Sequence, residues 1–138
     1  MAGVMADNGS KQVLSEARTT WNTTALKLHL FVNNITPTTS NVIGDFTEAS
    51  FTGYAAASIV TWAAPSVAAH IASMSPASVT FTRTATGTVQ TVYGYYVTDN
   101  ANTVLYWSER DANAPINITN NGDSYTVTLT LAAKDVSV

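Results

Sequence analysis

The sequence predicts an all-β protein, an antiparallel β-sandwich or jelly-roll-like barrel of about eight strands, preceded by an N-terminal arm and one short helix. Apolar and polar residues alternate in several short runs, as expected for half-buried strands. Clusters of Gly, Pro, Asn and Asp separate these runs. The runs themselves are rich in β-branched and aromatic side chains, which fit pleated surfaces.

A chain of 138 residues is long enough to bury one hydrophobic core. No linker-like stretch or internal repeat divides it. We therefore expect an N-terminal arm and short amphipathic helix over residues 1–24 and a single β-sandwich domain over residues 25–138. The chain has no Cys, which excludes a disulfide framework and a thiolate metal site.

Residues 1–9 are expected to form the arm, and residues 11–19 the helix. Three residues could cap that helix: Asp7, Asn8 and Ser10. Four apolar residues form a stripe along one side: Val13, Leu14, Ala17 and Trp21. The stripe packs on the protein's own sheet or docks on a neighbouring subunit. Both interpretations are open, because a helix of under about 12 residues is marginal without tertiary support.

Residues 90–110 are predicted to form the central hairpin, with strands at 90–98 and 103–109. Asn and Asp in the turn tolerate left-handed backbone and hydrogen-bond within their own loop. Gly94, amid the aromatic residues, predicts a bulge or a close backbone approach. Five large aromatic residues belong to this hairpin: Tyr93, Tyr95, Tyr96, Tyr106 and Trp107.

Outside the hairpin, strands are expected at residues 25–33, 55–63, 77–83, 116–118 and 124–132. The strongest alternation lies in the first of them, where four apolar residues alternate with Lys27, His29 and Phe31. Residues 65–76 fit a loop with one helical turn as well as a strand.

The formal net charge is −3, and only 11% of residues are charged. The six basic residues are scattered, whereas binding to a phosphate backbone needs clustered Lys and Arg. No apolar run approaches the roughly 18 residues of a membrane span, and no signal-peptide pattern is visible. We therefore expect neither a nucleic acid nor a membrane as partner.

The carboxylates Asp45 and Glu48 lie three residues apart, and paired carboxylates can act as acid and base in glycoside hydrolysis. Residues three apart on a strand face opposite sides, so this pair is not expected to converge. Neither a GxSxG elbow nor a Gly-rich phosphate loop occurs. No catalytic residue is therefore predicted. An enzyme such as a hydrolase using Glu48 or Glu109 is kept as a third hypothesis.

Metal and cofactor sites have weak support. His29 and His70 are the only histidines, and neither belongs to a zinc-binding pattern. His29 is expected on the polar or edge face of its strand, in contact with solvent. The turn residues with oxygen ligands lack the order of a calcium loop: Asp99, Asn100 and Asn102. We predict no metal and no cofactor.

Segments along nearly the whole chain together resemble a known group of proteins: LKLHLFVNN (26–34) followed by Thr36-Pro37, DFTEASFTGY (45–54), Trp62, VYGYYVT (92–98), LYWSER (105–110) and NNGDSYTV (120–127). In combination they resemble small β-rich virion structural proteins of tailed bacteriophages, including capsid cement, or decoration, proteins of phages that infect cyanobacteria. That family has no catalytic motif to transfer.

The resemblance implies a non-catalytic protein that binds the outer surface of the mature capsid across neighbouring major capsid protein subunits. It also implies a homotrimer, made in the host cytoplasm and located on the virion. The alternative is a receptor- or glycan-binding module of a phage tail or capsid surface. The hairpin tyrosines fit a core and subunit interface, or a platform on which sugars stack.

The residues expected at interfaces fall into two groups. The helix stripe, with the arm before it, is the candidate contact to the shell: Val13, Leu14 and Trp21. The hairpin is the candidate contact between protomers: Tyr93, Tyr95 and Tyr96. Glu109 and Arg110, at the end of the hairpin, are expected to form a local ion pair or an intersubunit contact.

Overall fold

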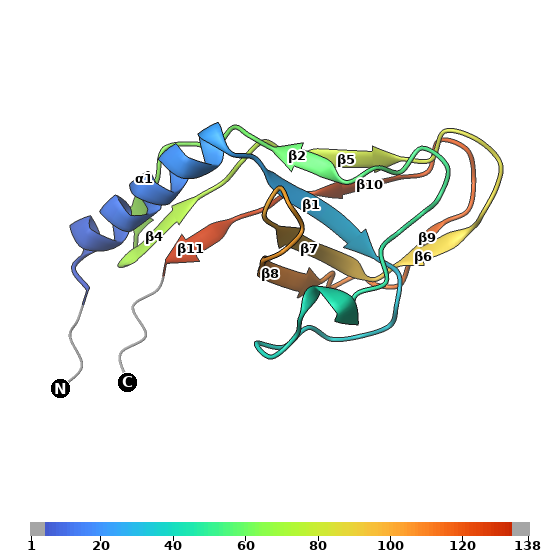
Figure 1. The fold of residues 1–138 in the computed structure, drawn as a ribbon, viewed down its shortest axis with the longest axis horizontal. Coiled ribbons are helices and arrows are strands. Elements are labelled where there is room, and N and C mark those ends of the chain that lie inside the picture. The colour runs from blue at the N-terminus through green and yellow to red at the C-terminus, as the bar shows by residue number, and fades with distance from the viewer. Residues whose placement is uncertain (1–4, 134–138) are drawn as a thin grey trace. The chain divides into compact units, whose positions relative to one another are not determined.

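The computed structural model describes residues 5–133. Over this range it contains one α-helix, α1 (Asp7–Thr23), a 3-10 turn, η1 (Ile43–Asp45), and eleven short strands (Figure 1). The strands are β1 (Leu26–Phe31), β2 (Ala57–Ile59), β3 (Ser66–Ala68), β4 (Ile71–Met74), β5 (Val79–Thr82), β6 (Gln90–Val92), β7 (Gly94–Thr98), β8 (Leu105–Arg110), β9 (Ile116–Ile118), β10 (Ser124–Val127) and β11 (Leu131–Ala133). The predicted all-β class with a preceding helix is confirmed.

The strands form antiparallel sheets in the orders β2-β1-β7-β8, β10-β5, β11-β4-β3 and β6-β9. Eleven strands replace the expected eight over residues 5–133, because the predicted runs break. Residues 90–98 split at Tyr93 into two strands that pair with different neighbours. Residues 124–132 split in the same way, and residues 65–76 form the β3–β4 hairpin.

Contacts within the chain define two compact units. Among the described residues, the first unit contains residues 5–25, 59–78 and 128–133, and the second contains residues 26–58 and 79–127. The predicted domain boundary after residue 24 stays a prediction. Residues 1–4 of the expected arm and residues 134–138 of the expected domain lie outside the described range.

In the first unit, α1 lies against β3, β4 and β11. The helix begins at Asp7 and ends at Thr23, so it is longer than predicted at both ends. Its N-cap is Ala6, which makes no capping bond through its side chain. Asp7, Asn8 and Ser10 are therefore helical residues rather than caps, and Asp7 places a negative charge in the first turn, where the helix dipole favours it.

The last turns of α1 are fixed to Trp62. The Arg18 Nε–H donates to the Trp62 carbonyl (2.7 Å), and Asn22 Oδ1 accepts from the Trp62 N–H (2.9 Å). The rings of Trp21 and Trp62 lie 5.2 Å apart. The strand predicted to reach Trp62 is wrong in length: β2 ends at Ile59, and Trp62 forms only an isolated bridge to Pro76.

In the second unit, the central strands β1 and β7 of the β2-β1-β7-β8 sheet are covered on both faces. All five residues of β7 and five of the six residues of β1 are buried. One face buries Leu28, Leu30 and Val97 completely. The other face holds a cluster of Phe31, Phe46 and Tyr96, against which the segment after β1 packs. This second face brings the loop before η1 beside the β7–β8 hairpin.

Candidate functional site

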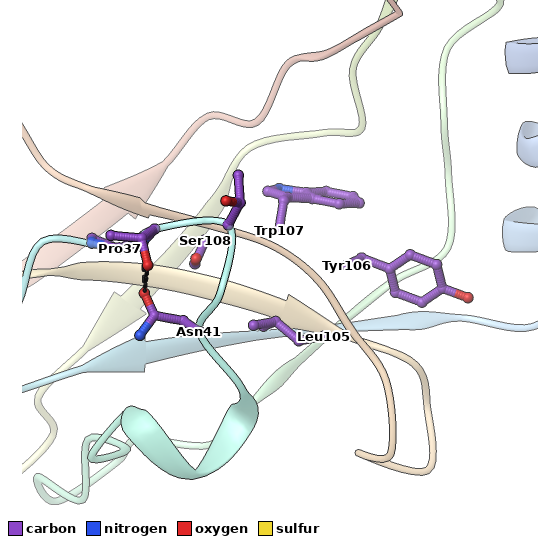
Figure 2. A pocket seen from close by; sticks show the side chains of 8 residues that line it. Pro37, Asn41, Leu105, Tyr106, Trp107 and Ser108 are labelled. Atoms are coloured by element: carbon purple, nitrogen blue, oxygen red, sulfur yellow. Dashed lines mark hydrogen bonds between the residues drawn. The ribbon is translucent and has the colours of Figure 1, made fainter.

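Two neighbouring hollows lie between the loop of residues 37–44 and the hairpin segment of residues 102–108. Their volumes are about 400 Å³ and 560 Å³, within the range of small-ligand sites. Both hollows are lined by Asn41 and Leu105, so they form one continuous strip, which we call the groove. Figure 2 shows the first hollow, with Leu105 to Ser108 supplied by β8 and Pro37 and Asn41 by the loop.

The groove is lined without a single Asp, Glu, Lys, Arg or His among the described residues. Hydroxyl, amide, aliphatic and aromatic side chains alternate along it. Three of its large apolar or aromatic side chains are exposed to solvent: Val42 (61%), Val104 (49%) and Tyr106 (45%). A concave surface that combines exposed apolar side chains with a few polar groups is typical of a place where another molecule binds.

The loop wall of the groove is held in shape by Asp45. The Asn41 amide donates to Asp45 Oδ2 (2.8 Å), and the Val42 N–H donates to the same oxygen (2.9 Å). These two hydrogen bonds, with that from Asn41 the stronger influence, lower the pKa of Asp45. Asn41 Oδ1 in turn accepts from the Thr38 N–H (2.6 Å), so the wall is formed before any ligand arrives.

The hairpin wall is held by Asp99 in a similar way. Asp99 Oδ1 accepts from the N–H groups of Val104 (2.7 Å) and Thr103 (2.6 Å), and Oδ2 accepts from the Thr103 hydroxyl (2.8 Å). The bond from Val104, followed by that from the Thr103 hydroxyl, lowers the pKa of Asp99. The predicted turn chemistry is confirmed, with Asn102 in left-handed backbone (φ 57°). Both carboxylate oxygens are already used by the chain.

Hydrogen bonds around the buried His29 connect this turn to β1. His29 is only 3% exposed, so its expected contact with solvent is wrong. Its Nδ1 lies 2.8 Å from Glu48 Oε1, and its Nε2 lies 3.0 Å from Thr98 Oγ1 and 3.1 Å from Asn102 Oδ1. The ring stacks on Tyr96 at 4.6 Å. Both faces of β1 are therefore inside the protein: Leu28 and Leu30 are buried on the even-numbered face, and His29 and Phe31 on the odd-numbered face.

The line from Glu48 through His29 to Thr98 has the residue types of an acid, a base and a hydroxyl nucleophile. Thr98 is completely buried, however, and its hydroxyl donates to Asn102 Oδ1 (2.8 Å). A substrate could not reach that hydroxyl without opening the sheet. The arrangement therefore fixes the hairpin turn. Asp45 and Glu48 serve separate partners, as their spacing predicted.

The predicted hairpin contacts lie mostly inside the chain. Tyr95 and Tyr96 are buried, and the Tyr95 hydroxyl donates to Glu109 Oε2 (2.5 Å). Arg110 lies over the Tyr93 ring, 5.0 Å from its centroid, and donates to the Ile35 carbonyl (3.0 Å). Glu109 and Arg110 do not pair with each other among residues 5–133. Their place in an interface stays a prediction.

The predicted helix contacts belong to the first unit and take no part in the groove. Leu14 is buried within that unit, Trp21 is half-buried, and Val13 is exposed. The structure thus supports packing on the protein's own sheet for Leu14. Val13 is the member of the stripe whose side chain is open to a partner, and the predicted contact to a shell stays a prediction.

Sequence reasoning missed the groove itself. Tyr106 was expected only as one aromatic of the hairpin, and neither Val42 nor Val104 was singled out. The available signal was the run Val104-Leu105-Tyr106-Trp107, four apolar or aromatic residues without alternation. Because successive side chains of a strand point to opposite faces, such a run places some of its apolar side chains outside. Here the β7–β8 register also shifts beside the run, between Val97 and Thr98.

No protein-family model matches this sequence, and no curated protein or solved structure matches it. Within residues 5–133, no helix combines the length and apolarity that crossing a membrane requires. In the same range, no three His, Asp or Glu side chains gather in a way that could hold a metal ion. Inference about function therefore depends on the groove and on the residue patterns.

Proposed function

We propose that this chain is a non-catalytic capsid cement protein of a tailed phage. It binds the outer surface of the mature capsid across neighbouring major capsid protein subunits, as a homotrimer, and stabilises the shell. The resemblance in sequence suggested this function. The observation that carries it in the structure is the groove, a pre-formed surface without charge.

The chemistry of the groove suits a protein interface. The centres of such interfaces are depleted of charged residues and enriched in aromatic ones, and the groove has both properties. Its exposed Val42 and Val104 lose contact with water when a partner covers them. A protein that binds only the expanded shell stabilises that state by mass action, without any chemical step.

The test compares phage shells with and without the protein. Shells that carry it should rupture at a higher temperature than shells that lack it, and equal survival would contradict the proposal. Tyr106→Ala should weaken binding to the shell, because it removes a large exposed ring from the groove. Thr126→Ala, on an exposed position of β10 outside the groove, is the matched control and should bind like the wild type.

A second candidate function is glycan binding. It is favoured by the half-exposed Tyr106 ring beside Trp107, at a centroid distance of 6.3 Å, in a groove otherwise rich in hydroxyl and amide groups. Aromatic faces pack against apolar faces of sugars while their polar ends stay wet. A glycan array decides the matter: binding that Tyr106→Ala abolishes supports this function, and an array without binding removes it.

A further inference from the structure

The strand that borders the groove is the last of its sheet. In the order β2-β1-β7-β8, β8 has a paired neighbour on one side, and no other strand of residues 5–133 pairs with its second side. An open strand edge is a template for one more strand. The question is which backbone groups of β8 point toward that edge.

The answer follows from the hydrogen bonds of β1. The Leu30 N–H donates to the Tyr54 hydroxyl, and the Leu30 carbonyl accepts from the Ala49 N–H, so the backbone of Leu30 points away from β7. Tyr95 is the register partner of Leu30. Two opposite residues of an antiparallel pair either both point their backbone groups at each other or both point them away. The backbone groups of Tyr95 therefore point away from β1 and toward β8, where the register partner is Glu109.

The N–H and C=O groups of Glu109 therefore point toward β7. Asp111, two residues later, does the same, since its N–H donates to the Tyr93 carbonyl (2.9 Å). Backbone direction alternates along a strand, so Ser108 and Arg110 present their N–H and C=O groups on the outer edge. Within residues 5–133, the backbone groups of Ser108 and Arg110 that point outward make no hydrogen bond.

Where it meets the groove, the edge lacks two of the usual protections, charged side chains and Pro. Native sheets protect open edges with charged side chains, Pro or bulges. Residues 105–108 contain no charge and no Pro. The nearest cation is Arg110, whose guanidinium group donates to the Ile35 carbonyl and lies over the Tyr93 ring. The register shift lies within this stretch, at Tyr106, because Val97 pairs with Trp107 and Thr98 pairs with Leu105. Ser108 lies beyond the shift, in regular pairing with Tyr96.

We infer that the groove takes an extended, uncharged segment of the shell protein, which adds as a further strand along the outer edge of β8. This inference rests on the proposed function and specifies the kind of shell-protein segment that the protein binds. The absence of charge in the groove selects a neutral segment, because a buried charge there would have no partner. Backbone hydrogen bonds supply affinity, and Val42 and Leu105 select small apolar side chains.

The test uses the full chain and expanded empty shells of the phage that encodes it. Ser108→Pro removes one outward N–H without touching the ladder to β7, and Pro is tolerated at such edge positions. We expect it to weaken binding to shells at least about tenfold. Ser108→Ala is the matched reference, because it removes the same hydroxyl from the groove and keeps the N–H. The tenfold loss is therefore measured between Ser108→Pro and Ser108→Ala. Thermal unfolding of both variants checks that the fold is intact.

Hydrogen exchange gives a second readout. The amide protons of Ser108 and Arg110 should exchange rapidly in the free protein and at least about tenfold more slowly on the shell. Shell binding with unprotected amides, and with Ser108→Pro as tight as Ser108→Ala, would overturn strand addition and leave the cement function standing. Absence of any shell binding would overturn both. Concentration-dependent self-association lost in Ser108→Pro would assign the edge to a second copy and overturn the inference.

Discussion

Phe31 occupies the space that a side chain on residue 94 would need. A Cβ placed on Gly94 would lie 2.8 Å from Cε1 and Cζ of Phe31, and it would also overlap the backbone carbonyl of Glu109. The close approach predicted from a glycine amid aromatic residues is confirmed. The contact matters because Phe31 belongs to the cluster on which Ile43, in the loop wall of the groove, packs.

The first prediction concerns this contact. Gly94→Ala should lower the free energy of unfolding by about 1–3 kcal/mol, because the added methyl group has no room between Phe31 and the backbone of β8. Urea unfolding at neutral pH measures the change. Gly44→Ala is the matched control, since no atom lies within 4 Å of its added Cβ, and it should leave stability almost unchanged. An equal effect of both substitutions would contradict the packing argument.

The second prediction concerns His29. His29→Leu should lower the free energy of unfolding by about 1–3 kcal/mol, because the buried hydroxyl of Thr98 and the side-chain oxygen of Asn102 lose a hydrogen-bond partner. The other histidine gives the control: His70 is highly exposed and pairs with Asp7 at the surface, so His70→Ala should change stability by less than about 0.5 kcal/mol. Thermal unfolding of the two variants measures both losses of stability. A larger loss for His70→Ala than for His29→Leu would contradict the role given to the His29 hydrogen bonds.

The sequence was most informative where one local rule acts alone. Alternation placed β1, whose Leu28 and Leu30 are buried, and the short strand 116–118 was predicted with its observed bounds. Asx chemistry placed the hairpin turn at Asp99. These features depend on neighbours within a few residues, so a single sequence contains the information that decides them.

Prediction failed where distant segments decide the outcome. The odd-numbered face of β1 reads as polar, yet His29 is buried because Glu48 and the hairpin turn supply its hydrogen-bond partners. Residues 90–98 read as one strand, but Tyr93 donates to Phe31 and accepts from Asp111, which breaks the run. The groove was missed for the same reason: its walls are more than fifty residues apart, and they come together where Ile43 and Leu105 both pack on the Phe31 cluster.

The third prediction concerns acid. The folded-state pKa of Asp99 is below its ordinary value, so its contribution to stability is complete above about pH 4, the ordinary pKa of Asp, and is lost as the pH falls through the folded value. Asp99→Asn keeps one acceptor oxygen but cannot titrate. Urea unfolding should show the variant less stable than the wild type at neutral pH, with a difference that shrinks as the pH is lowered below about 4. A difference that stays constant with pH would contradict the assignment.

The fourth prediction concerns alkali. Burial, helped by the charge of Glu48, raises the pKa of Tyr96 to about 12. A buried phenol that resists ionisation contributes stability that is complete below about pH 10, the ordinary pKa, and is lost as the pH rises toward the folded value. In Tyr96→Phe the ring still stacks on His29 and Phe46 but cannot ionise. Raising the pH from about 8 to about 11.5 should therefore lower the free energy of unfolding of the wild type more than that of the variant. If both proteins lost the same free energy of unfolding, the prediction would be contradicted. The sensitivity to alkali would then belong to other tyrosines, whose pKa values burial raises further.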